Sequence, residues 1–111
     1  MDHARLVTDF YDRHPINEAQ ILSALARQGK TPEALGPEDL FPLDQDHYGG
    51  LQAVEALARR AGIRGESRVL DVCAGLGGPA RFLAWRYGCR VAAIDLSESR
   101  CRSATRLTRL V

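Results

Sequence analysis

The most informative stretch of the sequence is RVLDVCAGLGGPAR, residues 68–81. Its opening segment is short, mainly apolar and contains β-branched valines, a composition that predicts a buried parallel strand over residues 68–72. A glycine-rich turn follows, and Pro79 is typical of the first turn of a helix, which we expect to end at Gly88. The stretch therefore predicts a strand, a tight turn and a helix in that order.

The residues after this stretch predict a second strand and a last helix. The segment RVAAID, residues 90–95, is again short and apolar, and Ser97 can cap the helix after it. One side of that helix is formed by Cys101, Ala104, Thr108 and Val111. Strand, helix, strand and helix together make one βαβ unit plus a following helix, which places the chain in the α/β class.

The residues before the first strand predict mainly helices. We expect a first helix that Pro15 ends, a second over about residues 17–28 and a third over about residues 50–61, with a helical turn after Pro32. Residues 37–46 are predicted as a loop. The apolar faces predicted for the helices contain Val7, Phe10, Tyr11 and His14; Ile21, Leu22, Leu25 and Ala26; Val54, Leu57, Ala58 and Ala61; and, after the glycine turn, Ala80, Leu83, Ala84 and Tyr87.

The glycine turn has the composition of a ligand-binding loop. Glycines let a ligand approach the backbone closely, and the helix behind them offers unpaired N–H groups. Asp95 follows Gly75 by 20 residues (95 − 75), at the tip of the second strand, where a carboxylate can accept both hydroxyls of a ribose. The spacing of Gly75, Gly77 and Ala80 also matches the dinucleotide fingerprint G-x-G-x-x-G/A, a weak signal alone.

Asp71 favours a different class of nucleotide site, because a dehydrogenase fingerprint normally keeps the first strand apolar. An acid at the end of that strand, before the glycine turn, resembles motif I of the class I S-adenosylmethionine-dependent methyltransferases. The segment DQDHYGG, residues 44–50, resembles the entry segment of their small-molecule members, and GLGGPAR, residues 75–81, is a familiar form of their motif I. The specific resemblance covers about residues 44–107.

This resemblance implies a Rossmann-like methyltransferase fold, truncated to one βαβ unit plus N-terminal helices. Residues 1–43 would form a helical extension and residues 44–111 part of the cofactor domain. The implied cofactor is S-adenosylmethionine and the implied partner a small-molecule methyl acceptor, with no catalytic residue assigned. The resemblance places the cofactor against Asp71, Cys73, Ala74, Gly75, Gly77, Asp95 and Leu96. Cys73 departs from the family, which has its first motif glycine there, and its side chain narrows the space beside the methionine portion.

Two other classes of function remain open at this point. The chain could be a fragment of an NAD(P)-binding oxidoreductase, or a non-catalytic helical interaction module that retains a relic of a nucleotide fold. Single residues also have structural interpretations. Asp71 could accept backbone N–H groups, Cys73 could be a small packing residue, and His47 is expected to be structural or exposed. Phe82 and Trp85 lie off the predicted apolar face, and a solvated face is predicted for Arg100, Arg102, Arg106 and Arg109.

Composition and charge limit the remaining classes. The net charge of +1 gives no reason to expect nucleic acid or an acidic membrane as partner. Three cysteines without CxxC spacing predict neither a disulfide framework nor a metal site. The sequence shows no signal peptide and no membrane-spanning run, so a cytoplasmic location is expected. We also expect a fragment, because two parallel strands leave open edges through which the chain would self-associate.

Overall fold

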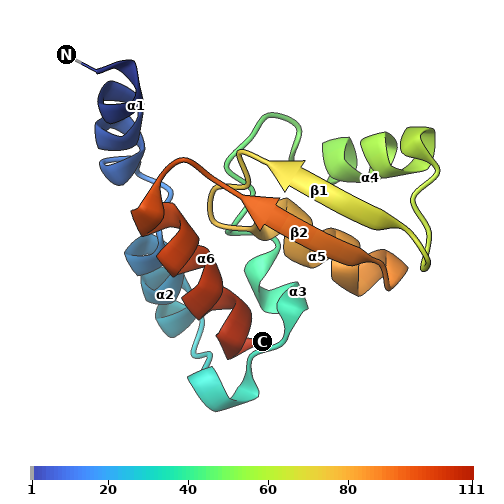
Figure 1. The fold of residues 1–111 in the computed structure, drawn as a ribbon. Helices are drawn as coiled ribbons and strands as arrows, with labels where there is room; N and C mark the ends of the chain where they lie inside the picture. Colours follow the sequence, from blue (N-terminus) through green and yellow to red (C-terminus); the bar gives the residue numbers. More distant parts are fainter. Residues whose placement is uncertain (1) are drawn as a thin grey trace.

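The two predicted strands form a parallel pair in the computed structural model, which describes residues 2–111 (Figure 1). Strand β1 covers Arg68–Val72 and β2 covers Arg90–Ile94. Their register pairs Arg68 with Arg90 and Val72 with Ile94, so both strands end at the same edge of the sheet. Helix α5, Gly78–Tyr87, connects them, as the sequence predicts.

The helices flanking the strands begin and end at the predicted signals. Helix α4, Gly50–Ala61, ends at Gly62, whose left-handed backbone donates its N–H back into the last turn. Helix α6, Glu98–Leu110, begins after Ser97, whose side chain accepts the N–H of Arg100. These boundaries confirm the predicted order of helix, strand, helix, strand and helix.

Four shorter elements precede α4. They are α1 (His3–Asp12), α2 (Glu18–Arg27), the 3₁₀ turn η1 (Pro32–Ala34) and α3 (Pro37–Leu40). The prediction of a loop from residue 37 onward is wrong for its first four residues. Pro37 supplies a helical φ there, and the Asp39 side chain accepts the N–H of Gly36, which closes the helical turn.

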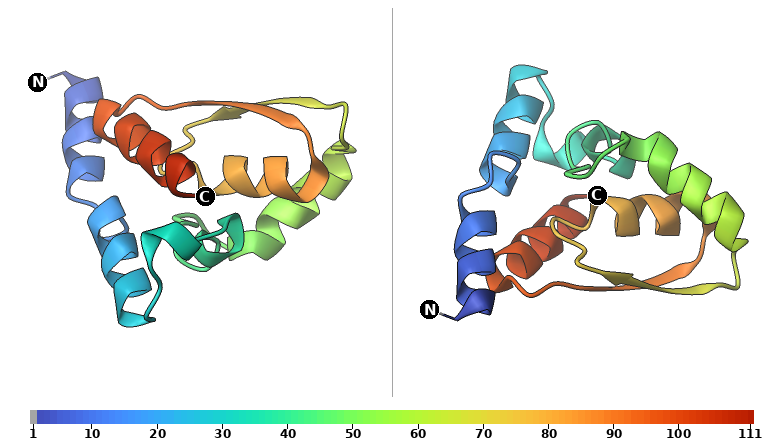
Figure 2. Two further views of the ribbon diagram at one scale, coloured as in Figure 1. Left: turned by 90° about the horizontal axis from the view of Figure 1, so that it is seen from below. Right: turned by 90° about the horizontal axis from the view of Figure 1, so that it is seen from above.

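The helices α4, α5 and α6 lie on one face of the sheet (Figure 2). The prediction that residues 68–72 form a buried strand is wrong for one face, because Leu70 and Val72 are each 61% exposed, and Ile94 of β2 is 51% exposed as well. These side chains share the face opposite the helices, and no described helix covers it. Helices α1 and α2 stand beyond the end of the sheet, with α1 near the carboxyl ends of the strands (Figure 1).

Two hydrophobic clusters hold the layers together. We call the first the sheet-side cluster, since it packs α4 and α5 against Val69 and Val91 of the strands; its buried members are Phe41, Val54, Ala58, Phe82, Leu83 and Cys89. The second is the turn-side cluster, which joins α2, α3 and α6 to the glycine turn; its buried members are Ile21, Leu25, Leu40, Leu76 and Leu107. The turn is therefore part of the core.

Several predicted apolar faces are only partly buried. Leu57 of α4 is 69% exposed, while Val54 and Ala58 of the same stripe are buried. Helix α1 has no buried residue, so its apolar face does not enter the core. Phe82, placed off the apolar face of α5 by its spacing, is buried because its ring meets the Phe41 ring edge-on at 5.3 Å.

Candidate functional site

A cavity of about 400 Å³ opens at the carboxyl ends of the strands, where ligands of parallel sheets commonly bind. Six of the seven predicted site residues line it: Asp71, Cys73, Ala74, Gly75, Asp95 and Leu96. The other wall comes from Val7, Thr8 and Tyr11 of α1, together with Asp46, His47, Pro79, Ser97 and Arg100. Gly77 does not line this cavity; together with Ala74, Gly75 and Asp95 it lines a second cavity between α5, α6 and β2.

Asp95 ties the glycine turn to the end of β2. Its Oδ2 accepts the N–H of Gly75 at 2.8 Å, and its Oδ1 accepts the N–H of Ser97 at 2.9 Å. The neighbouring Ala74 N–H donates to the carbonyl of Ile94 at 3.0 Å. Each carboxylate oxygen keeps a further lone pair after one hydrogen bond, so Asp95 can still accept hydroxyl donors from a ligand.

Asp71 brings a carboxylate with one unpartnered oxygen to the same cavity. Its Oδ2 is buried and has no hydrogen-bond partner, so the structural interpretation, in which Asp71 accepts backbone N–H groups, has no support at this atom. Burial raises the pKa of Asp71, the nearby His47 lowers it, and repulsion from Asp95 raises it further. A ligand carrying a positive charge or a donor here would relieve the cost of this buried oxygen.

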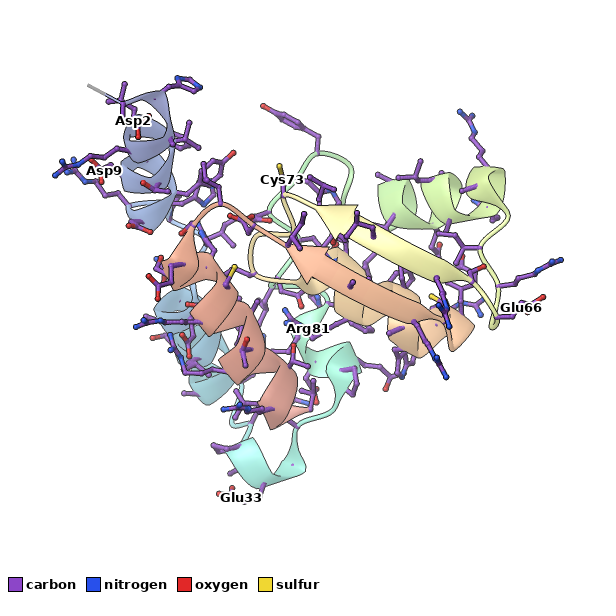
Figure 3. The ribbon with its side chains drawn as sticks, viewed as in Figure 1. Asp2, Asp9, Glu33, Glu66, Cys73 and Arg81 are labelled. Carbon is purple, nitrogen blue, oxygen red and sulfur yellow. The ribbon has the colours of Figure 1, made fainter. Side chains whose placement is uncertain are left out.

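Cys73 stands at the tip of β1 with its side chain exposed (Figure 3). Its φ of +61° is the only positive φ of a non-glycine among residues 2–111. A Cβ in this left-handed region crowds the backbone and costs about 1–2 kcal/mol. Cys73 therefore adopts the backbone conformation of this turn at a cost in strain.

Replacing Cys73 with glycine is expected to stabilise the chain. Removing the Cβ relieves about 1–2 kcal/mol of strain, and the greater freedom of glycine in the unfolded state takes back about 0.5–1 kcal/mol. Urea unfolding should therefore show a net gain of about 0.5–1 kcal/mol. Cys73→Ala is the matched control, because it keeps the Cβ and should gain nothing. Equal unfolding midpoints for both variants would contradict the strain.

The segment before α4 covers the glycine turn from the side of the cavity. The carboxylate of Asp46 lies so close to Gly75 that a Cβ built there would sit 3.2 Å from Asp46 Oδ2. The ring of His47 contacts its own segment, with Nε2 2.8 Å from Gln45 Oε1 and Nδ1 3.0 Å from the carbonyl of Tyr48. His47 is exposed, as expected, and it also lines the cavity.

Arg100 lines the cavity, and the prediction that it lies on a solvated face is wrong. Only 3% of it is exposed, and its guanidinium donates to the carbonyls of Ile16 at 2.7 Å and Tyr11 at 2.9 Å. It thereby fixes the end of α1 against α6. The sequence held a signal for this position, because Arg100, Ala104 and Leu107 follow helical spacing, and Leu107 is fully buried.

A buried ion pair beneath the turn was also missed. Arg81 Nη2 lies 3.1 Å from Asp44 Oδ2 and 2.6 Å from the carbonyl of Leu76, while Nη1 donates to the carbonyl of Ala104 and to Thr108 Oγ1. The Asp44 side chain is fully buried. Figure 3 shows Arg81 between the helices below the sheet. This side chain therefore connects the turn, α6 and the segment before α4.

Comparison with known proteins confirms the resemblance to class I methyltransferases. Over 61 residues the chain is 50% identical to the sarcosine/dimethylglycine N-methyltransferase of Halorhodospira halochloris, which covers 55% of this chain and 21% of that protein. Over 58 residues it is 41% identical to the glycine/sarcosine/dimethylglycine N-methyltransferase of Actinopolyspora halophila, or 52% of this chain and 10% of that protein.

A third relative acts on a different kind of acceptor. Over 42 residues the chain is 50% identical to the sterol 24-C-methyltransferase of Eremothecium gossypii, which covers 38% of this chain and 11% of that protein. The matches thus span about a fifth of these relatives or less. No family model matches the chain.

Two further observations concern residues 2–111 only. Nowhere in this range do three or more His, Cys, Asp or Glu side chains gather so that they could hold a metal ion. None of the helices described has the length and apolar character needed to cross a membrane.

Proposed function

We propose that this chain forms the cofactor-binding part of an S-adenosylmethionine-dependent methyltransferase of Rossmann-like fold, which methylates a small-molecule acceptor. The observation that supports this most is the pair of carboxylates on either side of the glycine turn. Asp71 presents an unpartnered buried oxygen and Asp95 retains free lone pairs, and both line one cavity. The relatives are methyltransferases, which supports the reaction class.

The residues present fit the chemical groups of this cofactor. Asp95 would accept the ribose hydroxyls, since its hydrogen bonds to Gly75 and Ser97 leave acceptor positions open. Asp71 would face the positively charged methionine portion, which matches its unpartnered oxygen. Leu96, which is 62% exposed beside Asp95, offers apolar surface to a purine ring. The bound cofactor supplies an activated methyl group, and the chain's role is to hold it in a fixed orientation.

The acceptor is proposed only as a class. Two relatives are named for amino-acid methylation and one for a sterol, so both nitrogen and carbon acceptors occur among them. Methyl transfer from this cofactor depends largely on aligning the acceptor with the methyl group.

The charges around the turn disfavour the alternative of an NAD(P) site. Three carboxylates, those of Asp46, Asp71 and Asp95, line the cavity with the turn. An anionic pyrophosphate seated on this turn would be repelled by them, whereas a sulfonium and an ammonium group would be attracted. Arg100 offsets only part of this charge, because it brings one positive charge against three carboxylates; its Nη1 lies 3.9 Å from Asp46 Oδ2.

Isothermal titration calorimetry tests the proposal directly. We expect S-adenosylmethionine and S-adenosylhomocysteine to bind more tightly than NAD to the same preparation, because the carboxylates favour the cationic ligand portion. Asp95→Ala should weaken both by about tenfold or more, the value of a charge-assisted hydrogen bond. Tighter binding of NAD, or no effect of Asp95→Ala, would overturn the assignment.

Binding of S-adenosylmethionine is expected to weaken as the pH falls through the raised pKa of Asp71. Burial raises this pKa above its ordinary value of 3.8. The ionised carboxylate attracts the cationic ligand and the protonated form does not, so binding is strongest above the raised pKa. The free energy of unfolding depends on pH in the opposite direction. Because the raised pKa means that the folded state binds the Asp71 proton more tightly than the unfolded state does, stability falls as the pH rises from 3.8 through the raised pKa.

Calorimetry across acidic to neutral pH measures this dependence. Asp71→Asn is the matched control, because the amide has the same shape but does not titrate. The variant should bind more weakly at neutral pH and should lose most of the pH dependence. If Asp71→Asn showed the same pH profile as the wild type, another group would be responsible.

A further inference from the structure

We infer that Leu76 is a positioning residue for the cofactor site, and that α2 and α3 act on the site through it. The side chain of Leu76 is only 1% exposed and belongs to the turn-side cluster. The ligand-facing residues of the turn are therefore adjacent to a leucine that packs against helices distant in the sequence. The effect on cofactor affinity rests on the proposed function, whereas the effect on turn geometry does not.

The backbone on either side of Leu76 requires the leucine to point into the core. Gly75 and Gly77 both have left-handed backbones, with φ of +56° and +79°. Side chains rarely adopt this conformation, so glycines are suited to both positions and the leucine between them carries the only side chain of the three. Gly75 lines the ligand cavity, while the Leu76 side chain enters the cluster on the other side.

The partners of Leu76 are as completely buried as Leu76 itself. Ile21 of α2, Leu40 of α3 and Leu107 of α6 are each 0% exposed. Close-packed interiors have few alternative arrangements, so the position of Leu76 is set by these three side chains. The N-terminal helices thereby fix the position of the turn backbone relative to the cavity.

Hydrogen bonds transmit this position to the ligand-facing atoms. Arg81 Nη2 holds the carbonyl of Leu76 at 2.6 Å, and the Gly77 N–H donates to the carbonyl of Ala74 at 2.9 Å. The N–H of Gly75, the residue before Leu76, donates to Asp95 Oδ2 at 2.8 Å. A shift of Leu76 would therefore lengthen the bond that orients the proposed ribose acceptor, and ligand contacts tolerate displacements of only about 0.5 Å.

The test compares two buried leucines, one in each cluster. Leu76→Ala removes the turn-side contact, and Leu83→Ala makes the same truncation in the sheet-side cluster. In the ligand-free protein, hydrogen–deuterium exchange of the Gly75 and Gly77 amides should accelerate in Leu76→Ala and stay near wild type in Leu83→Ala. Affinity for S-adenosylhomocysteine should fall by about three- to thirtyfold in Leu76→Ala and by less than about twofold in Leu83→Ala.

Variants on α2 extend the test to the helical extension. Ile21→Val removes one methyl group from the fully buried partner and should change exchange and affinity in the same direction, but less. Leu22→Val is its matched control, because Leu22 is 40% exposed on the same helix. Leu76→Met, which conserves volume, should restore wild-type exchange. Trp85 is the one tryptophan, and its ring lies near those of Phe41 and Phe82. Its fluorescence therefore shows whether each variant is folded.

The outcomes separate this inference from the proposed function. Equal acceleration of the turn amides in Leu76→Ala and Leu83→Ala would show that the turn follows overall stability, which overturns the inference. If Leu76→Ala does not fold, the difference between Ile21→Val and Leu22→Val decides it. A wild type that fails to bind S-adenosylhomocysteine would overturn the proposed function, while the exchange of the ligand-free protein would still decide whether Leu76 positions the turn.

Discussion

Gly78→Ala is expected to destabilise the chain by about 3 kcal/mol or more, a large share of the roughly 5–15 kcal/mol that stabilises a typical domain. A Cβ on Gly78 would lie 2.2 Å from the carbonyl oxygen of Asp44 and 2.7 Å from Gln45 Nε2. The nearer atom belongs to the backbone, so no side-chain rotation can remove the clash. Relief would require the segment before α4 to leave the turn.

Urea unfolding followed by Trp85 fluorescence measures this effect. Gly36→Ala is the matched control, because a Cβ there meets nothing within 4 Å and the backbone is extended, with φ of −119°. Its stability should change by no more than about 0.5 kcal/mol. Similar midpoints for the two variants would mean that Asp44 does not sit against Gly78 in solution.

The local structure around the turn could be predicted from sequence because each boundary has a chemical signal. Gly62, Gly88 and Ser97 end or begin helices through their own backbone or side chain, and the structure confirms all three. Such signals act over a few residues, so one sequence suffices to recognise them. The short helix α3 was missed because four residues give no periodicity.

The packing could not be predicted to the same extent, because helical spacing defines a face without defining what covers it. The first strand was expected to be buried, yet Leu70 and Val72 are each 61% exposed. Phe82 is buried through an aromatic contact with Phe41, 41 residues earlier (82 − 41), which spacing within α5 cannot indicate. Self-association through the open sheet edges stays a prediction.

In the candidate site, too, the local features were predicted and the long-range contacts were missed. Six predicted residues surround one cavity because they lie at the carboxyl ends of adjacent parallel strands, a consequence of topology that the βαβ pattern already implies. Their role in binding a cofactor stays a prediction. The wall from α1 and the buried Arg100 were missed, since contacts between the first and last helices depend on long-range packing. The domain division at residues 43 and 44 also stays a prediction, although the turn-side cluster contains residues from both sides of it.

Arg81→Met is expected to be the second strongly destabilising change, at about 3–5 kcal/mol near neutral pH. Arg81 and Asp44 form a buried pair with side chains 7% and 0% exposed. Removing only the guanidinium leaves the Asp44 carboxylate without its cation and the carbonyl of Leu76 without its donor. The loss therefore includes an uncompensated buried charge in addition to the missing contacts.

The pH dependence of this loss distinguishes the buried charge from lost packing. Burial already raises the pKa of Asp44 above 3.8, and the attraction of Arg81 opposes that rise. Without Arg81 the pKa should rise further, so the variant should lose stability as the pH increases from 3.8 through the new pKa, and its deficit should shrink in acid. In the double variant Asp44→Asn/Arg81→Met nothing at this position titrates. Urea unfolding should therefore show a smaller deficit at neutral pH than in Arg81→Met, and the added loss of stability that Arg81→Met shows between acid and neutral pH should be absent. A deficit of Arg81→Met that is the same in acid and at neutral pH would mean that Asp44 carries no buried charge beneath the turn.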